Sequence, residues 1–177
     1  IGDKAEENTL KELKSPKLLH FATHAYFNQE EIDENNENEF ATNPMLNSGL
    51  LLANAGDLLD DAENANVNSK SGVLTAYEAS SMSLDNTDVV IMSACETGLG
   101  QVQVGEGVAG LQRAFQEAGA KTVVMTLFKV NDNVTRKFMK IFYSKWLNGT
   151  DKRIAFAETK REIKKEFPQP IYWGSFV

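Results

Sequence analysis

Two side chains in this sequence could do chemistry together. His24 lies in the segment FATHA, and Cys95 lies in SACETGLG just after the apolar run at 88–92. An imidazole beside a thiol can take its proton, and the resulting thiolate can attack a carbonyl carbon. Glycines after the thiol let backbone N–H groups approach the oxyanion that develops. The two residues therefore indicate thiol-based nucleophilic catalysis, provided that the fold brings them together.

Each of these side chains also has an ordinary structural interpretation. A lone cysteine such as Cys95 commonly packs as a small apolar side chain, and a histidine such as His24 commonly serves as a hydrogen-bonded residue at the end of a strand. His20 stands inside the apolar run KLLHFA, so we interpret it as a core histidine with its hydrogen bonds satisfied. It is the poorer candidate for catalysis.

A second motif, GEGVAG at 105–110, matches the GxGxxG pattern of dinucleotide-binding folds. That pattern normally follows its strand directly, whereas about a dozen residues separate Met92 from Gly105 here. Glu106 would also direct a carboxylate at the pyrophosphate. We interpret the glycines as a turn that lets the next helix pack closely, and nucleotide binding stays a distant alternative.

Neither a metal nor a cofactor is expected. His20, His24 and Cys95 show no CxxC or HExxH spacing. The densest carboxylates fall at 28–43, where six Asp and Glu residues occur without a single Lys or Arg. Such a segment buries too little apolar surface to offset the entropy of ordering, so we expect a disordered acidic loop there.

The elements that must position the reactive residues follow from the apolar patterns. Compact apolar runs at 17–22, 48–53, 88–92 and 122–127 predict strands, and the first of these lacks polar alternation, as in a strand covered on both faces. Helical spacing predicts helices over 5–14, 108–118, 134–146 and 154–167, and Gly119 ends the helix over 108–118. Thr75 and Glu78 form a capping box for a further, short helix. Strands and helices alternate in the second half, which indicates an α/β three-layer sandwich with a mostly parallel sheet.

In such a sheet, reactive groups gather at the carboxyl ends of the strands. His24 and Cys95 each follow a predicted strand. If those two strands are neighbours, their axes lie about 4.8 Å apart, and the imidazole and thiol can face one another at one edge.

Composition restricts the setting. The chain has 177 residues and a net charge of -7, which argues against a surface for nucleic acid. It is 42% apolar, as a globular domain requires, and its single cysteine cannot form an internal disulfide. No apolar run approaches the roughly 20 residues that span a bilayer, so we expect no membrane partner and a cytoplasmic, reducing location.

These motifs resemble those of the CHAT domain, a caspase-like cysteine peptidase module related to caspases and separase and often found downstream of TPR repeats. The resemblance covers nearly the whole chain. It runs through LLHFATHA, NPMLNSGLLLANAG, GVLTAYEAS, VVIMSACETGLG, GEGVAGLQRAFQEAGAKTVVMTLFKVND and the closing Trp173.

The resemblance implies an endopeptidase that cleaves a protein substrate, with His24 as base and Cys95 as nucleophile. It implies that the N–H groups of Cys95 and Ala25 hold the oxyanion, although the family usually has Gly in place of Ala25. Phe128 stands where the family generally has Trp, as an aromatic wall of the substrate site. Asp132 corresponds to the acidic residue that reads a basic P1 side chain in separase; its ordinary alternative is the N-cap of the helix beginning near Asn133.

The resemblance also implies a domain larger than the strands visible here. Caspase-like sheets have about six strands, so we expect an upstream segment or partner chain to complete the sheet and regulate the site. The sequence is thus interpreted as the C-terminal part, 1–177, of a regulated peptidase domain lacking N-terminal strands. The alternative is a scaffold or interaction module that kept the fold and lost efficient catalysis, as the Ala25 departure suggests.

Overall fold

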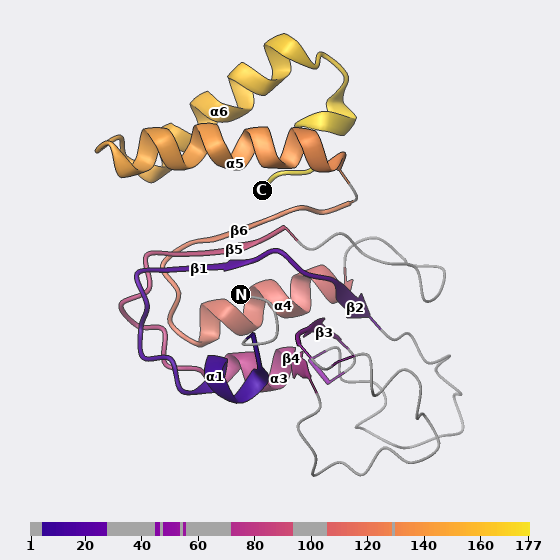
Figure 1. The fold of residues 1–177 in the computed structure, drawn as a ribbon, viewed down its shortest axis with the longest axis vertical. Coiled ribbons are helices and arrows are strands. Elements are labelled where there is room, and N and C mark those ends of the chain that lie inside the picture. Colours follow the sequence, from indigo (N-terminus) through magenta and orange to yellow (C-terminus); the bar gives the residue numbers. More distant parts are fainter. Residues whose placement is uncertain are drawn as a thin grey trace. The chain divides into compact units, whose positions relative to one another are not determined.

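A computed structural model describes residues 5–27, 45–46, 48–53, 55, 72–93, 106–128 and 130–177. The chain divides into two compact units, Ile1–Val124 and Met125–Val177, and each is described by itself (Figure 1). The expected acidic loop at 28–43 lies outside the described residues. Within the described ranges, no helix is long and apolar enough to cross a membrane.

The central sheet has the strand order β1-β5-β6, formed by β1 (Leu18–Phe21), β5 (Val89–Met92) and β6 (Val123–Met125). β1 and β5 are parallel, from the pair Leu18↔Val89 to the pair Phe21↔Met92. Every residue of β5 is buried, as its unbroken apolar run predicts. Three of the four predicted strands therefore form a mostly parallel sheet, and the prediction of an α/β fold is confirmed.

The remaining predicted strand belongs to a different sheet. β3 (Ser48–Leu51) pairs antiparallel with both β2 (Ala25–Phe27) and β4 (Val73–Thr75), in the order β2-β3-β4. β2 and β4 were not predicted, because three residues are too few to show a periodic pattern and their neighbours specify them instead. The described residues thus hold two sheets of three strands each.

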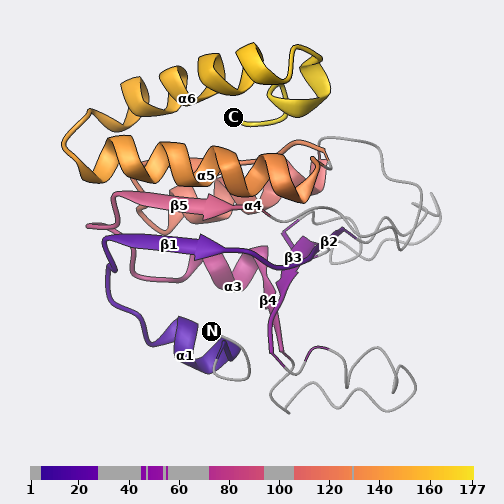
Figure 2. The ribbon, with the colours of Figure 1, turned by 45° about the horizontal axis from the view of Figure 1, so that its top comes forward.

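Three helices of the first unit lie within the described residues. α1 is Glu7–Lys11, α3 is Ala76–Ser80 and α4 is Glu106–Glu117. The predicted capping box of α3 is confirmed: the Glu78 N–H donates to Thr75 Oγ1 at 3.2 Å, and the Thr75 N–H donates to Glu78 Oε2 at 3.0 Å. α4 packs against α3 in the first unit (Figure 2). Its Phe115 ring also stacks on the ring of Phe21 in β1, with the ring centroids 5.4 Å apart.

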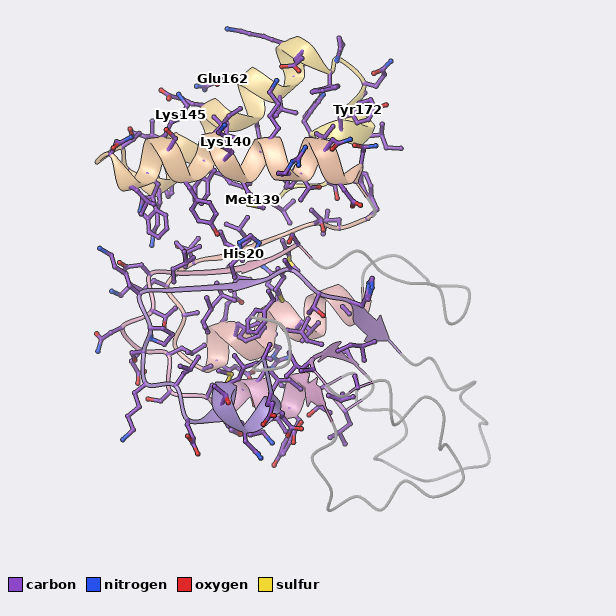
Figure 3. All side chains as sticks on the ribbon, viewed as in Figure 1. His20, Met139, Lys140, Lys145, Glu162 and Tyr172 are labelled. Atoms are coloured by element: carbon purple, nitrogen blue, oxygen red, sulfur yellow. The ribbon has the colours of Figure 1, made fainter. Side chains whose placement is uncertain are left out.

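The second unit consists mainly of two helices, and the last residues of the chain pair with the end of β6 and the segment that follows it. α5 (Asp132–Leu147) and α6 (Lys152–Glu166) lie side by side and are followed by the 3-10 helix η2 (Pro170–Tyr172). Lys145 on α5 pairs with Glu162 on α6 at 2.9 Å (Figure 3). The last residues run antiparallel to the end of β6, where the N–H of Met125 donates to the Val177 carbonyl at 2.9 Å. The ring of Phe176 is fully buried.

Candidate active site

His24 stands where the chain leaves one sheet and enters the other. It follows the end of β1 by three residues and comes directly before Ala25, the first residue of β2. Its side chain is exposed. The imidazole therefore lies on a short connection at the carboxyl end of β1, a parallel strand of the central sheet, as expected, and it is open to solvent.

The strand that precedes Cys95 is the direct neighbour of the strand that precedes His24. The β1–β5 ladder ends at Phe21↔Met92, and the Ser93 N–H extends it by donating to the Phe21 carbonyl at 3.0 Å. His24 follows Phe21 by three residues, and Cys95 follows Met92 by three. The expected parallel neighbourhood of the two strands is confirmed. Cys95 itself lies outside the described residues, so its place beside His24 stays a prediction.

The register of β2 determines where the Ala25 amide points. Ala25 pairs with Leu50, and the Leu51 N–H donates to the His24 carbonyl at 2.8 Å. In an antiparallel ladder this places Ala25 and Leu50 in a non-hydrogen-bonded pair, whose amides point away from the partner strand. The Ala25 N–H is therefore turned away from β3 and is not consumed by that pairing.

An alanine fits this position without backbone strain. Ala25 is part of a strand, a conformation open to any L-residue. Among the described residues other than glycine, positive φ occurs at Ser15 and not here. The departure from the family's glycine therefore requires no unusual backbone at this point.

His20 is the second-last residue of β1, close to the carboxyl end of that strand (Figure 3). Its Nε2 is 3.1 Å from Ser93 Oγ, which in turn donates to the Phe21 carbonyl at 3.4 Å. Desolvation by neighbouring atoms lowers the pKa of His20 below its ordinary value. The side chain is hydrogen-bonded as expected, but the expectation of a core position covered on both faces was wrong: His20 is exposed, while Leu19 and Phe21 beside it are buried.

The two expected specificity residues lie in the second unit. Phe128 is 37% exposed, and Ser175 Oγ binds both its N–H, at 3.0 Å, and its carbonyl, at 2.8 Å. Asp132 is exposed and is the first residue of α5. The N-cap is Asn131, whose side chain accepts the Asn133 N–H at 3.0 Å, so the alternative of Asp132 as N-cap was wrong. The part of Asp132 in specificity stays a prediction.

The other sites that the sequence raised are a dinucleotide site and a metal site. α4 begins at Glu106, two residues earlier than predicted, so Gly107 lies within the helix rather than in a turn before it. A dinucleotide fingerprint needs that turn, and Gly105 lies outside the described residues. Among the residues that the structure describes, no group of three or more His, Cys, Asp or Glu side chains could hold a metal ion.

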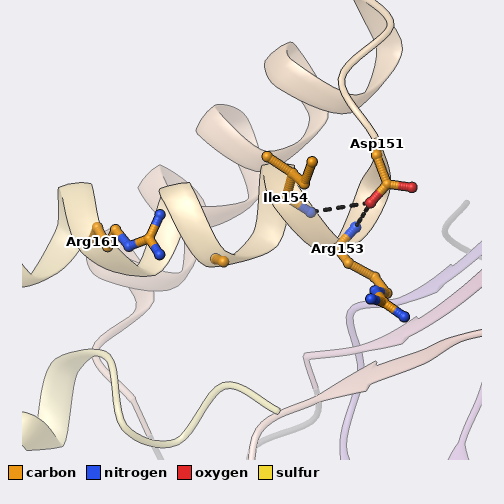
Figure 4. Close-up of a pocket in the computed structure, with 5 residues that line it drawn as sticks. Asp151, Arg153, Ile154 and Arg161 are labelled. Atoms are coloured by element: carbon orange, nitrogen blue, oxygen red, sulfur yellow. Dashed lines mark hydrogen bonds between the residues drawn. The ribbon is translucent and has the colours of Figure 1, made fainter.

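One hollow lies on the second unit, along the start of α6 (Figure 4). It has a volume of about 500 Å³ and is lined by Asp151, Arg153, Ile154, Ala157 and Arg161. Asp151 caps the helix by accepting the N–H groups of Arg153 and Ile154 at 3.0 and 3.2 Å. The lining holds no thiol and no imidazole, so this hollow is not a candidate for the thiol-based catalytic site.

The structure is that of an α/β protein, and its candidate hydrolytic site lies at the carboxyl ends of the neighbouring parallel strands β1 and β5. The CHAT domain model matches residues 1–177, so the chain belongs to the CHAT domain family, which is related to the caspase-like peptidases. Tetratricopeptide repeat protein 28 of Mus musculus is 26% identical over 188 residues, which covers 100% of this chain and 8% of that protein. The Homo sapiens protein of the same name is 32% identical over 107 residues, covering 59% of this chain and 4% of that protein. The chain thus spans less than a tenth of the length of these curated relatives.

Proposed function

We propose that this chain is a cysteine endopeptidase domain in which His24 is the general base and Cys95 the nucleophile. The observation that carries the proposal is the parallel register of β1 and β5, with its last pair Phe21↔Met92. Parallel strands end at one edge of the sheet, and each of these two is followed, at the same distance along the chain, by one member of the dyad.

The proposed reaction is acyl transfer to sulfur followed by hydrolysis. His24 takes the thiol proton, the Cys95 thiolate attacks the peptide carbonyl, and the imidazolium gives its proton to the leaving amine. Water then attacks the thioester with His24 again as base, which releases the acid and restores the thiol. The N–H groups of Ala25 and Cys95 stabilise the oxyanion in both halves. The direction of the Ala25 amide, away from β3, supports this role.

Substrate recognition is proposed for the exposed pair Asp132 and Phe128. A carboxylate that is not used as an N-cap can bind the guanidinium or ammonium group of a P1 Arg or Lys. Phe128 would supply an apolar wall beside it.

Regulation is proposed to come from a segment or chain outside the described residues. In the described part of the central sheet, β1 is an edge strand with β5 on one side. A bare edge favours the addition of another strand, which would extend the sheet towards a caspase-like three-layer sandwich. Both relatives are named as tetratricopeptide repeat proteins, so a TPR region is the proposed regulatory partner. The proposed substrate is a protein, because the proposed activity is that of an endopeptidase.

The second candidate function is a scaffold with weak catalysis, and the residue that favours it is Ala25 in place of glycine. The strand conformation of Ala25 accommodates its side chain, and its N–H group is not bound by β3, which leaves it available as a donor. We therefore favour the peptidase over the scaffold.

Hydrolysis of a fluorogenic peptide amide with Arg at P1 tests the proposal. We expect Cys95→Ala to abolish turnover and His24→Ala to lower kcat/KM by about 10²- to 10⁴-fold, as loss of a general base does. His20→Ala is the matched control, since it removes the other histidine of the chain and should keep most of the activity. Turnover that survives Cys95→Ala would refute Cys95 as the nucleophile, and an inactive wild type with its upstream partner present would favour the scaffold.

A further inference from the structure

The connection that carries His24 is fastened to β3 at one residue. The Leu51 N–H donates to the His24 carbonyl at 2.8 Å, and the Leu51 carbonyl accepts the hydroxyl of Thr23. Both backbone groups of Leu51 are therefore bound by two consecutive residues, Thr23 and His24. The Thr23 side chain is partly buried, which shields this hydrogen bond from competing water.

The Thr23 hydroxyl takes a place that a backbone amide would otherwise fill. If the β2–β3 ladder continued by one residue, His24 and Leu51 would exchange two backbone hydrogen bonds. In the described residues one of these is present, and the Leu51 carbonyl is bound by Thr23 Oγ1 instead of by the His24 N–H. The β2–β3 ladder thus ends at His24. The hydroxyl of Thr23 satisfies the Leu51 carbonyl, which would otherwise lack a donor at this end of the ladder.

This arrangement turns the chain while holding it in place. His24 joins a parallel strand of the central sheet to an antiparallel strand of the other sheet, so its backbone must leave regular pairing there. A connection without anchors would let the imidazole move over several conformations. A displacement of about 1 Å at a catalytic group can cost about a hundredfold in rate.

We propose that Thr23 is a positioning residue for His24, acting through its hydroxyl on the Leu51 carbonyl. This inference rests on the proposed function for its catalytic consequence, but the positioning itself does not depend on catalysis. The Thr23 hydroxyl donates to the Leu51 carbonyl, so the proposed action of this side chain is to fix the backbone that carries the imidazole.

The test compares two variants of Thr23 in the full chain. Thr23→Val keeps the shape and removes the donor, so we expect kcat on the Arg peptide amide to fall about ten- to hundredfold with KM changed less than threefold. Thr23→Ser keeps the donor and should restore at least a third of wild-type kcat. Thr159→Val is the matched control: it removes another hydroxyl-to-carbonyl bond, from Thr159 Oγ1 to Ala155 at 2.7 Å, in the second unit. It should lower the melting temperature and leave kcat unchanged.

A spectroscopic measurement keeps the positioning claim separate from the activity claim. The chain has two histidines, so ring C–H signals in NMR spectra are readily assigned with the His20→Ala variant. We expect Thr23→Val to shift and broaden the His24 ring signals, and Thr23→Ser to leave them close to wild type. If Thr23→Val fails to fold, Thr23→Ala takes its place in both measurements.

Unchanged His24 signals in folded Thr23→Val would overturn the positioning role, as would a Thr23→Ser variant as impaired as Thr23→Val. An inactive wild type combined with shifted His24 signals would refute the proposed function and leave the positioning role standing. The two failures are therefore distinguishable.

Discussion

At the scale of single residues, substitution of Asp132 should affect substrate recognition much more than stability. Its carboxylate lies in the first turn of α5, where it interacts favourably with the helix dipole, and Asn131 supplies the cap. We expect Asp132→Asn to cost about 0.3–1 kcal/mol of stability, because only the dipole term is lost. The same substitution should lower kcat/KM for Arg at P1 by at least tenfold and leave an apolar P1 substrate unaffected. Hydrolysis of the two peptides in competition measures the change in P1 preference, and chemical denaturation measures the change in stability.

Asn131→Ala provides the comparison for that experiment. It removes the cap and should cost about 0.5–2 kcal/mol, more than Asp132→Asn, without altering the P1 preference. Equal loss of activity on the Arg and apolar peptides in Asp132→Asn would show that Asp132 does not read the P1 side chain.

The residue scale also shows how far the sequence could predict the site. Residue type and spacing correctly predicted the strand before His24 and indicated His24 as a candidate, because a histidine after an apolar run is visible in the sequence. The direction of the Ala25 amide and the anchor at Thr23 could not be predicted, since both depend on the register against β3, a partner more than twenty residues away. The sequence signal for this anchor was a residue with a hydroxyl group, Thr23, directly before the histidine at the end of a strand. Asn131 and Asp132 are both good caps, so sequence alone could not choose between them.

At the scale of elements, the contact between α1 and α3 predicts a pH dependence. Lys11 on α1 lies 2.7 Å from Glu78 on α3. Burial alone would raise the pKa of Glu78, but hydrogen bonds from Lys11 and from Thr75 hold it below its ordinary value. A carboxyl whose pKa is lowered by folding stabilises the fold above its unfolded pKa, and that contribution is lost as the pH falls through the folded value.

The melting temperature of wild type should therefore fall more steeply than that of Glu78→Gln between about pH 5 and pH 3. Because the pair is partly exposed, we expect a difference of only about 1–3 °C. Glu117→Gln is the matched control: its ion pair with Arg113 is more exposed, with side-chain fractions of 43% and 75%. Parallel curves for wild type and Glu78→Gln would contradict the assignment.

Two glycines that end helices form a second matched pair. Gly119 after α4 and Gly149 after α5 have φ values of +100° and +97°. A Cβ at Gly119 would lie 2.8 Å from the Cα of Asp85, whereas one at Gly149 would meet nothing within 4 Å. Gly149→Ala should cost about 1–2 kcal/mol for the left-handed backbone alone. Gly119→Ala should cost about 1–3 kcal/mol more, because the backbone of Asp85 must move.

Chemical denaturation of both variants measures this difference. Equal losses would show that the space around Gly119 adjusts freely. The helix ends themselves were predictable, since a glycine closes an apolar periodicity and a capping box opens one. The antiparallel sheet was not, because β2 and β4 have three residues each and derive their stability from pairing with β3.

At the scale of the whole molecule, the division into two units predicts local effects of core mutations. Phe176 is fully buried in the second unit and stacks on Phe138 at 3.9 Å. Phe176→Ala should cost about 3–5 kcal/mol, through lost contacts and the cavity that remains. Hydrogen exchange should show faster exchange in α5 and α6 and little change in β1 and β5. Val177→Ala, at a residue 43% exposed, is the control and should change neither the stability nor the hydrogen exchange of α5 and α6. Uniform loss of protection in Phe176→Ala would show that the chain unfolds as one unit.

The central claim is that an imidazole and a thiol, at the ends of neighbouring parallel strands, work as a pair. The pH dependence of Cys95 alkylation by iodoacetamide tests this most directly, because the reagent reports the thiolate and needs no substrate. We predict rapid labelling at pH 6–7 in wild type and in His20→Ala, and slow labelling in His24→Ala that rises only near the ordinary thiol pKa of about 8.5. Superimposable profiles for wild type and His24→Ala would contradict the account.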